Sequence, residues 1–317
     1  MARPVDLSRL KTFSISERGH KVESARVAGL PERGTTFAAW LASLPPYLGA
    51  ESLRRGVEAM VAARRADRGV AWALGAHVVK VGCGTIVADL IRRKAITAIA
   101  MNGATAIHDY ELATFGATSE EVADTIHDGR FGMVRETADF FGRAVAAAAK
   151  DDIGLGAATG RLLLSERSPN QHASILAAAA EAGVPATVHV ALGTDTIHMH
   201  PQIDPGALGR ASAVDFRLVC GVVSELGAAQ PGGAAGVWCN VGSAVVLPEV
   251  FLKAVAVARN LGHSLDELVA LNLDMQTHYR PRQNVIGRPV ARGHGFEIIG
   301  QHEILLPLIR QALVEAL

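Results

Sequence analysis

The residues of greatest chemical interest lie where an apolar run passes into a polar one, between Ile96 and Glu111. The run ITAIAM is followed by the small residues NGATA and then by IHDYE, which brings an imidazole and two carboxylates together within one helical turn. Such apolar runs are typical of strands buried on both faces of a parallel sheet. Small residues after the strand let a ligand approach the backbone, and the first amides of the next helix favour anionic groups. Because ligands of open α/β sheets bind in that crevice, we expect the functional site here.

Two histidines in the segment GTDTIHMHP suggest a different chemistry. His198 and His200 are two residues apart, so on a strand they would share a face and could bind zinc. Asp195, His189 or His108 would supply further ligands, and metal-bound water would make the protein a hydrolase. Because the chain has 12 scattered histidines, chance clustering competes with this interpretation, and we keep the metal site as an alternative.

Other strand ends also carry candidate residues. Asp195 follows the apolar run ATVHVAL, where its carboxylate either holds a ribose hydroxyl or an amine, or caps the next helical turn. Gly242 and Ser243 follow GVWCNV and either cradle a phosphate or serve the turn alone. Lys80 lies within HVVKVG, on the strand predicted to lead into the crevice, whereas Lys253 lies on a predicted helix and is expected to reach solvent.

The glycine pattern GLGAATG, at 154–160, invites a dinucleotide-binding interpretation. Its spacing is GxGxxxG, and an alanine-rich helix precedes it instead of a strand. A glycine pattern without its strand is a weak signal. We therefore predict a plain loop.

The overall composition limits the possible classes of function. The 317 residues include 31 basic and 31 acidic side chains, and this balance argues against a nucleic-acid or membrane-surface role. The three cysteines have no CxxC spacing, so a reducing cytoplasm is the expected location. We expect a soluble protein, because no uninterrupted apolar window approaches the ~18 residues of a membrane span and the N-terminus lacks the apolar core of a signal peptide.

The chain is predicted to form an arm followed by one large domain. Residues 1–35 are polar and basic, as in arms that reach a neighbouring subunit, and residues 36–317 show no break in composition. Two helices are expected between Thr36 and Arg65. Strand, turn and helix then alternate in at least four units, which predicts a doubly wound, mostly parallel α/β sheet with right-handed crossovers. The predicted strands are HVVKVG (77–82), ITAIAM (96–101), ATVHVAL (186–192) and GVWCNV (236–241).

The boundaries of the later elements follow from proline and glycine positions. Ser168 and Pro169 are predicted to start the helix that Gly183 ends, and Pro248 to start the one that Gly262 ends. AAQPGGAAG (228–236) is expected to be a surface loop. The tail from Asn284 is expected to form glycine-rich turns and then an amphipathic closing helix.

Three strand-end motifs together resemble the deoxyhypusine synthase family over roughly residues 70–285. The matching segments are GAHVVKVGCGTIVADLIRRKAITAIAMNGATAIHDYE, VPATVHVALGTD and GVWCNVGSAVVLPE. The resemblance implies a Rossmann-type nucleotide-binding domain and a homotetramer with NAD bound between subunits. It also implies cofactor-binding positions, which are Ala76, His77, Lys80, Asn102, Gly103, Ala104, His108, Asp195, Gly242, Ser243 and Ala244. Members of the family oxidise spermidine with NAD and transfer its aminobutyl group through a lysine imine.

The chain departs from this family where the chemistry would occur. The segment matching the family's catalytic lysine reads HYRPRQNVIGRPVARG, which has arginines and no lysine. Arginine stays protonated and cannot form the imine. His200 stands where the family has an acid that binds the polyamine, and Glu249 stands beside the position of an expected histidine. A pocket with His198, His200, Arg280 and Arg282 would suit an anion better than a polycation.

These patterns lead to one main hypothesis and two alternatives. The main one is an NAD-dependent, deoxyhypusine-synthase-like oxidoreductase or transferase that acts on a small polar substrate and does not synthesise deoxyhypusine. His108 or His200 would be the general acid or base, because the pKa of imidazole lies near operating pH, and Lys80 and Glu249 are the other catalytic candidates. The alternatives are the metal-dependent hydrolase built on His198 and His200, and a nucleotide-binding protein without catalysis.

Overall fold

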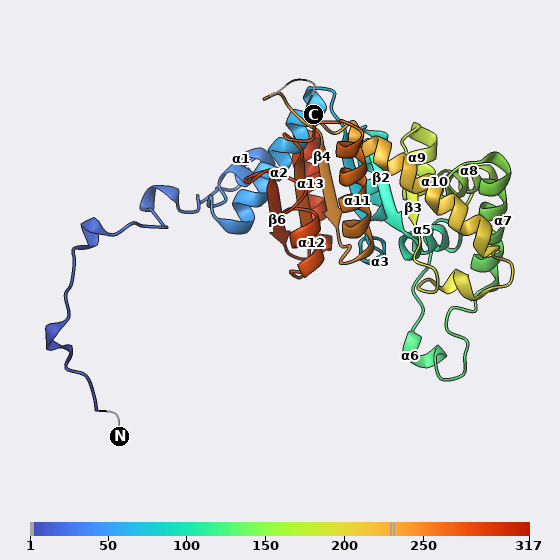
Figure 1. The fold of residues 1–317 in the computed structure, drawn as a ribbon, viewed down its shortest axis with the longest axis horizontal. Coiled ribbons are helices and arrows are strands. Elements are labelled where there is room, and N and C mark those ends of the chain that lie inside the picture. The colour runs from blue at the N-terminus through green and yellow to red at the C-terminus, as the bar shows by residue number, and fades with distance from the viewer. Residues whose placement is uncertain (1–2, 229, 231) are drawn as a thin grey trace.

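A computed structural model describes residues 3–228, 230 and 232–317. These residues form a six-stranded sheet in the order β3-β2-β1-β4-β5-β6, and every strand is parallel to its neighbours. Helices cover both faces of the sheet (Figure 1). The strands are β1 (Val70–Leu74), β2 (Ala98–Asn102), β3 (Ala186–His189), β4 (Val237–Val241), β5 (Val269–Asp274) and β6 (Gly295–Ile299). The doubly wound α/β fold predicted from the sequence is confirmed.

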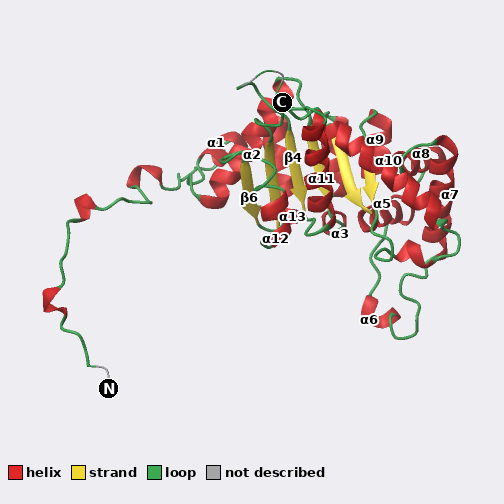
Figure 2. Cartoon of the chain, viewed as in Figure 1, coloured by secondary structure: helices red, strands yellow, loops and turns green. Residues whose placement is uncertain are grey.

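Helices connect the strands and flank the sheet (Figure 2). The α-helices are α1 (Phe37–Ala42), α2 (Leu48–Arg65), α3 (His77–Lys80), α4 (Gly84–Arg92), α5 (Gly103–Phe115), α6 (Val122–Thr125), α7 (Arg135–Asp151), α8 (Leu155–Glu166), α9 (Ile175–Ala182), α10 (Pro205–Ser224), α11 (Val246–Asn260), α12 (Tyr279–Asn284) and α13 (His302–Ala316). The short 3-10 turns are η1 (Leu7–Arg9), η2 (Ile15–Glu17), η3 (Ser24–Arg26), η4 (Gln171–Ala173) and η5 (Thr196–Met199). None of the described helices is long and apolar enough to cross a membrane.

The two faces of the sheet bury side chains of different size on its central strands. On β1, Trp72 and Leu74 join the larger core, beneath α2, α4 and α13, whereas Ala71 and Ala73 face the side covered by α10 and α11. The small alanines leave room there for Trp238 of β4, which stacks on Phe251 with ring centroids 4.5 Å apart. Continuous burial on both faces explains why these strands read as unbroken apolar runs.

Three of the four predicted strands are confirmed and one is wrong. ITAIAM, ATVHVAL and GVWCNV contain β2, β3 and β4, but HVVKVG forms α3 and the turn after it. The strand at this place is VAWAL, which pairs with both β2 and β4. Gly75 separates the two apolar runs, and its amide makes the last bond to β4, at Val241 O. Lys80 therefore lies at the end of a one-turn helix and not on a strand.

GLGAATG is not the loop that its sequence suggested. Gly154 is the N-cap of α8, and the other glycines lie inside that helix. A Cβ on Gly156 would lie 2.2 Å from the carbonyl oxygen of Ala186 on β3, and a Cβ on Gly160 would lie 2.6 Å from that of Leu176 on α9. These glycines let α8 lie directly against the sheet and its neighbouring helix.

Helix boundaries differ in part from the prediction. Ser174, and not Ser168, caps α9, because its hydroxyl accepts the Ala177 amide, while Gly183 ends the helix in the left-handed conformation as expected. Pro248 lies in the first turn of α11, and that helix ends at Asn260, close to Gly262. The predicted surface loop joins α10 to β4, although its residues Ala229 and Pro231 lie outside the described part. The tail contains a further strand, β6, before the predicted closing helix α13.

The described N-terminal residues extend away from the body of the molecule (Figure 1). Residues 3–36 contain only exposed side chains and single 3-10 turns. Among them are large apolar side chains that are 62–90% exposed, namely Val5, Leu7, Leu10, Phe13, Ile15, Val22, Val27 and Leu30. In a single copy of the chain these side chains have no cover.

A buried carboxylate ties α8 to the sheet. Asp215 of α10 is fully buried and accepts hydrogen bonds from the amides of Gly156, at 3.0 Å, and Val188, at 2.9 Å. Burial raises the pKa of Asp215 to about 7, although its backbone hydrogen bonds oppose the rise. The ionised form is therefore disfavoured in the folded protein relative to the unfolded chain.

The close approach of α8 to β3 predicts the effect of adding one methyl group. Gly156→Ala should destabilise the protein by about 1–3 kcal/mol, because the rigid carbonyl of Ala186 blocks the new Cβ. Gly209→Ala, on α10, is the matched control, since its Cβ would meet nothing within 4 Å. That control should gain about 0.5–1 kcal/mol from helix propensity. Urea denaturation of both variants measures the difference, and equal effects would contradict the packing described here.

The raised pKa of Asp215 predicts a pH-dependent stability. Between about pH 4 and pH 7 the folded protein binds a proton that the unfolded chain has lost, so the Asp215 contribution to the free energy of unfolding falls as pH rises, by up to about 4 kcal/mol. Asp215→Asn should remove this fall. Urea titrations of both proteins from pH 4 to 8 give the difference profile, and a flat difference would refute the prediction.

A neighbouring histidine opposes this effect, which is why the difference profile is needed. Burial lowers the pKa of His189 to about 4. Its contribution to stability therefore rises with pH between about 4 and 6.5, because only the unfolded chain is protonated there. Both proteins retain His189, so its contribution cancels in the comparison.

Candidate functional site

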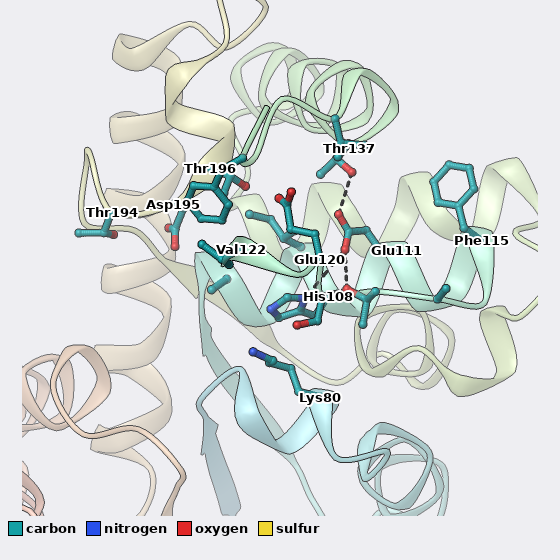
Figure 3. Close-up of a pocket in the computed structure, with 17 residues that line it drawn as sticks. Lys80, His108, Glu111, Phe115, Glu120, Val122, Thr137, Thr194, Asp195 and Thr196 are labelled. Atoms are coloured by element: carbon teal, nitrogen blue, oxygen red, sulfur yellow. Dashed lines mark hydrogen bonds and ion pairs between the residues drawn. The ribbon is translucent and has the colours of Figure 1, made fainter. Parts of the chain in front are cut away.

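A pocket of about 570 Å³ lies at the carboxyl ends of β2 and β3. Five segments form its wall, namely the end of α3, one face of α5, the connection between α5 and α7, the first turn of α7, and the turn that leads into η5 (Figure 3). The lining residues are Lys80, Ala104, Ile107, His108, Glu111, Phe115, Ala117, Thr118, Ser119, Glu120, Val122, Phe131, Val134, Thr137, Thr194, Asp195 and Thr196.

Local structure explains which side chains of α5 enter the pocket. The helix starts directly after β2, where the Asn102 side chain accepts the Thr105 amide at 2.9 Å. Ala104, His108 and Glu111 follow at helical spacing and therefore share one face. Gly116, with φ +73°, ends the helix and turns the chain back over this face.

A hydrogen-bonded group occupies the floor of the pocket. His108 Nδ1 lies 2.7 Å from the Thr118 hydroxyl, and that hydroxyl donates to Glu111 Oε2. The Thr137 hydroxyl donates to the other oxygen of Glu111 at 3.0 Å. Figure 3 shows these contacts, with Lys80 on the other side of His108. An imidazole oriented through a hydroxyl by a carboxylate is an arrangement that can move a proton.

The electrostatics of Glu111 fit this arrangement. Burial alone would raise its pKa, but the contacts with His108, Thr118 and Thr137 outweigh burial and hold the pKa below its usual value. Glu111 is therefore ionised near neutral pH and accepts hydrogen bonds with both oxygens.

Asp195 lies where α5 begins. Its carboxylate accepts the Ala104 amide and would meet a Cβ on Gly103 at 2.1 Å. Asp195 also stands at the N-cap of η5, where the capping interpretation puts it, and its amide donates to His198 Nδ1 at 3.3 Å. Burial raises the pKa of Asp195, while the charge of His198 and the Ala104 hydrogen bond lower it in part.

The structure divides the proposed cofactor-binding positions into two groups. Lys80, Ala104, His108 and Asp195 line the pocket, with Asn102 and Gly103 directly behind them. The others follow β1 and β4 and are Ala76, His77, Gly242, Ser243 and Ala244.

The ends of β1 and β4 approach each other closely. A Cβ on Gly75 would lie 1.9 Å from the Gly242 carbonyl oxygen, so only glycine fits there. His77 and the buried His302 lie beside this contact, with ring centroids 5.7 Å apart. This is the point at which the strand order reverses direction.

The proposed catalytic Glu249 and the two arginines lie elsewhere. Glu249 of α11 pairs with Lys253 and with Arg280, whose Nε lies 3.4 Å away. The Nε of Arg282 lies 3.6 Å from Glu297 of β6. None of these residues belongs to the lining of the pocket.

The histidines of the HxH pattern face different partners. They lie on the 3-10 turn η5 and at its end, not on a strand. His198 Nδ1 accepts the amides of Gly193 and Asp195, whereas His200 Nε2 lies 2.9 Å from the Gly132 carbonyl. Across residues 3–228, 230 and 232–317, no group of three His, Cys, Asp or Glu side chains is arranged to hold a metal ion.

Sequence reasoning singled out His108 but gave no role to the residues that contact it. Glu111 lies in the highlighted IHDYE segment, three residues after His108, and that spacing was the available signal. Thr118 and Thr137 reach the pocket from a connection and from α7. Single threonines at such positions carry no sequence pattern.

The sequence matches no protein-family profile and no curated protein. Similar solved structures include a candidate deoxyhypusine synthase from Entamoeba histolytica, with 12% identity, 89% of this chain and 94% of that one covered, and a TM-score of 0.52. A candidate LOR/SDH protein from Methanococcus maripaludis S2 has 15% identity, coverages of 85% and 70%, and a TM-score of 0.51.

A third similar structure is AgrE in a ternary complex with ornithine and NAD+, at 12% identity and a TM-score of 0.50. The match covers 83% of this chain but only 32% of AgrE, so the chain spans about a third of that protein's length. At these identities the likeness shows the fold alone, a Rossmann-type α/β fold.

Proposed function

We propose that this protein is an NAD-dependent enzyme, an oxidoreductase or a group transferase, that acts on a small polar substrate in the pocket lined by His108 and Glu111. The observation that carries the proposal is the position of that pocket at the carboxyl edge of a sheet with the strand order 3-2-1-4-5-6. In open sheets of this order, dinucleotides bind across the crevice where the order reverses. The NAD+ complex of AgrE, with the same type of fold, supports this choice.

The helix starts along this edge fit a dinucleotide. Asn102 and Asp195 already cap α5, so its first amides have partners. By contrast, α11 starts without a side-chain cap on its N-cap residue, Val245, in the described structure. The Ser243 hydroxyl accepts the Leu247 amide at 3.3 Å, and the positive end of the helix dipole favours phosphate at this point, which supports a pyrophosphate position at Gly242, Ser243 and Ala244.

The remaining cofactor positions extend from this crevice to the pocket. The strands β2 and β4 are separated by β1 alone, so their ends lie about 10 Å apart, a span that an extended dinucleotide covers. Residues that would hold the cofactor are Ala76, His77, Asn102, Gly103, Ala104, Asp195, Gly242, Ser243 and Ala244. NAD, when bound, supplies a hydride acceptor at this edge.

The pocket residues supply proton transfer and orientation. His108 accepts the proton that a hydroxyl or amine group loses when its carbon is oxidised. Glu111, Glu120 and Asp195 outnumber Lys80 in the lining, and Arg280 and Arg282 are paired elsewhere. These charges favour a substrate that carries hydroxyl or amine groups over the anion that the sequence suggested.

The same geometry supports a reaction other than deoxyhypusine synthesis. The segment that matches the family's catalytic lysine has none, and its Arg280 is paired with Glu249. Lys80 is the lysine that lines the pocket. One ring nitrogen each of His198 and His200 contacts backbone groups, and the described residues contain no group of three ligands that could hold the metal of the hydrolase alternative.

We further propose that the protein is a homotetramer whose N-terminal arms contact neighbouring subunits. The arm exposes eight large apolar side chains between Val5 and Leu30, and exposed apolar surface of this kind marks contact sites. The resemblance to deoxyhypusine synthases supports the same assembly.

The cofactor proposal predicts a stabilisation by NAD. At about 100 times its dissociation constant, NAD should add about 2.7 kcal/mol and raise the melting temperature. Ala244→Glu should remove most of this shift, because a carboxylate would then stand at the start of α11 where phosphate is expected. Ala213→Glu, at an exposed position on α10, is the control and should keep the full shift.

The thermal shift tests separately whether NAD binds and where it binds. A wild-type protein with no shift would contradict the NAD proposal itself. Equal shifts in both glutamate variants would place the dinucleotide away from Gly242–Ala244.

The assembly proposal predicts a mass near four times 33.2 kDa by light scattering at micromolar concentration. Leu10→Ser with Phe13→Ser should lower the mass, because both side chains are exposed in one chain and would be buried in the assembly. Ser8→Ala with Ser16→Ala is the matched control on the same arm. A wild-type mass of 33.2 kDa would disprove the tetramer.

A further inference from the structure

Among the described residues, the Thr118 hydroxyl bridges the imidazole of His108 and the carboxylate of Glu111. Its hydroxyl lies 2.7 Å from His108 Nδ1 and donates to Glu111 Oε2, whereas His108 Nδ1 and that oxygen are 3.9 Å apart. The described contacts therefore join His108 to Glu111 through a single hydroxyl group. A hydroxyl has one proton to donate and two lone pairs with which to accept.

The direction of these hydrogen bonds follows from the ionised carboxylate. Glu111 can only accept, so the proton of Thr118 must point to it. The Thr118 oxygen then offers a lone pair to His108, and a hydrogen bond forms only if Nδ1 carries the proton. In neutral imidazole the other nitrogen, Nε2, is then unprotonated and can act as a base.

We propose that Thr118 is a positioning residue that holds neutral His108 in the Nδ1–H tautomer and so directs the basic Nε2 lone pair to the substrate. The inference rests on the proposed role of His108 as the acid or base of the reaction. Nε2 has no hydrogen-bond partner among the described residues, so it is available to a ligand. After Nε2 accepts a proton from a substrate O–H or N–H group, Glu111 stabilises the imidazolium through Thr118.

Charged side chains from each neighbouring segment line the pocket around His108 and affect its charge. Glu111 comes from the same helix, Lys80 from α3, Glu120 from the connection after α5, and Asp195 from the turn before η5. Lys80 opposes a positive charge on the imidazole, while the three carboxylates favour it. Of these groups, only Glu111 is joined to the ring by the Thr118 hydroxyl.

The chain reversal at Gly116 explains how the Thr118 hydroxyl reaches His108. Gly116 takes a left-handed conformation at the end of α5, which reverses the chain and brings residue 118 back over the previous two turns. A second attachment, from the Gly132 amide to Glu120 at 2.8 Å, holds the other end of the connection. The hydroxyl is thus placed by the Gly116 turn on one side and by the Glu120–Gly132 hydrogen bond on the other.

Nitrogen-15 NMR of the histidines tests the proposal independently of turnover. In wild-type protein, neutral His108 should show a protonated Nδ1 and an unprotonated Nε2, with the signals assigned by their loss in His108→Gln. Thr118→Val should remove this preference and shift the ring towards the Nε2–H form. Thr118→Ser should restore it, because the hydroxyl is retained.

Kinetics with NAD and an accepted substrate give the second measurement. Thr118→Val should lower kcat by about tenfold to hundredfold with little change in KM, and Thr118→Ser should recover most of the loss. Thr114→Val is the control. Thr114 lies on α5, like His108, but its hydroxyl contacts Ser168 and does not line the pocket. It should leave both the NMR signals of His108 and turnover unchanged.

The two measurements distinguish the possible failures. A wild-type His108 in the Nε2–H form, or a Thr118→Val protein with the wild-type tautomer, would overturn the proposal even if the enzyme is active. The expected tautomer change without any NAD-dependent turnover would support the positioning role and contradict the proposed function.

Discussion

Hydrogen bonds from backbone amides to buried aspartates position the helices around β3, and the shape of the pocket depends on these hydrogen bonds. Asp109 of α5 accepts the Ser174 hydroxyl at 2.6 Å and the amides of Ile175 and Leu176, at the start of α9. Asp195 accepts an amide at the start of α5 itself. Charges placed at helix N-termini in this way satisfy amides that the helix leaves unpaired.

These contacts set the rotation of α5 about its axis. Asp109 points to α9, so the preceding residue, His108, and the later Glu111 are turned to the other side, where the pocket lies. Burial raises the pKa of both Asp109 and Asp195, because desolvation disfavours the ionised form of each carboxyl group. The orientation of the imidazole is thus a consequence of capping interactions made by its neighbours.

Much of the fold could be predicted from the sequence, because continuous apolar runs and glycine turns are local signals. The error at HVVKVG has a clear cause, since VAWAL and HVVKVG are both short apolar runs on either side of Gly75. Only pairing with β2 and β4 decides between them. GLGAATG was misread for a related reason. Its glycines serve contacts with β3 and α9, and such distant contacts leave no mark on neighbouring residues.

The site was predictable only in its central part. His108 and Asp195 follow apolar runs, and the rule that ligands bind at the carboxyl ends of parallel strands is enough to select them. Thr118 and Thr137 come from segments without periodicity, and their role arises from how the chain closes over α5. Arg280 and Arg282 were wrongly predicted to bind the substrate. Each is paired with a carboxylate, Glu249 or Glu297, on another element, and the local sequence does not show that pairing.

The lining of the pocket comes from two kinds of segment, which differ in how well they can tolerate substitutions. Lys80, the α5 face and Asp195 belong to the framework around the sheet, whereas Ser119, Val122 and Phe131 belong to a segment that projects from it (Figure 2). Substitutions or altered length between 121 and 131 would reshape the wall around Val122 and Phe131, while Thr118 and the Glu120–Gly132 hydrogen bond stay in place. Under the proposed function, an evolving lineage or a protein engineer could therefore exchange one substrate for another without rebuilding the group of His108, Thr118 and Glu111.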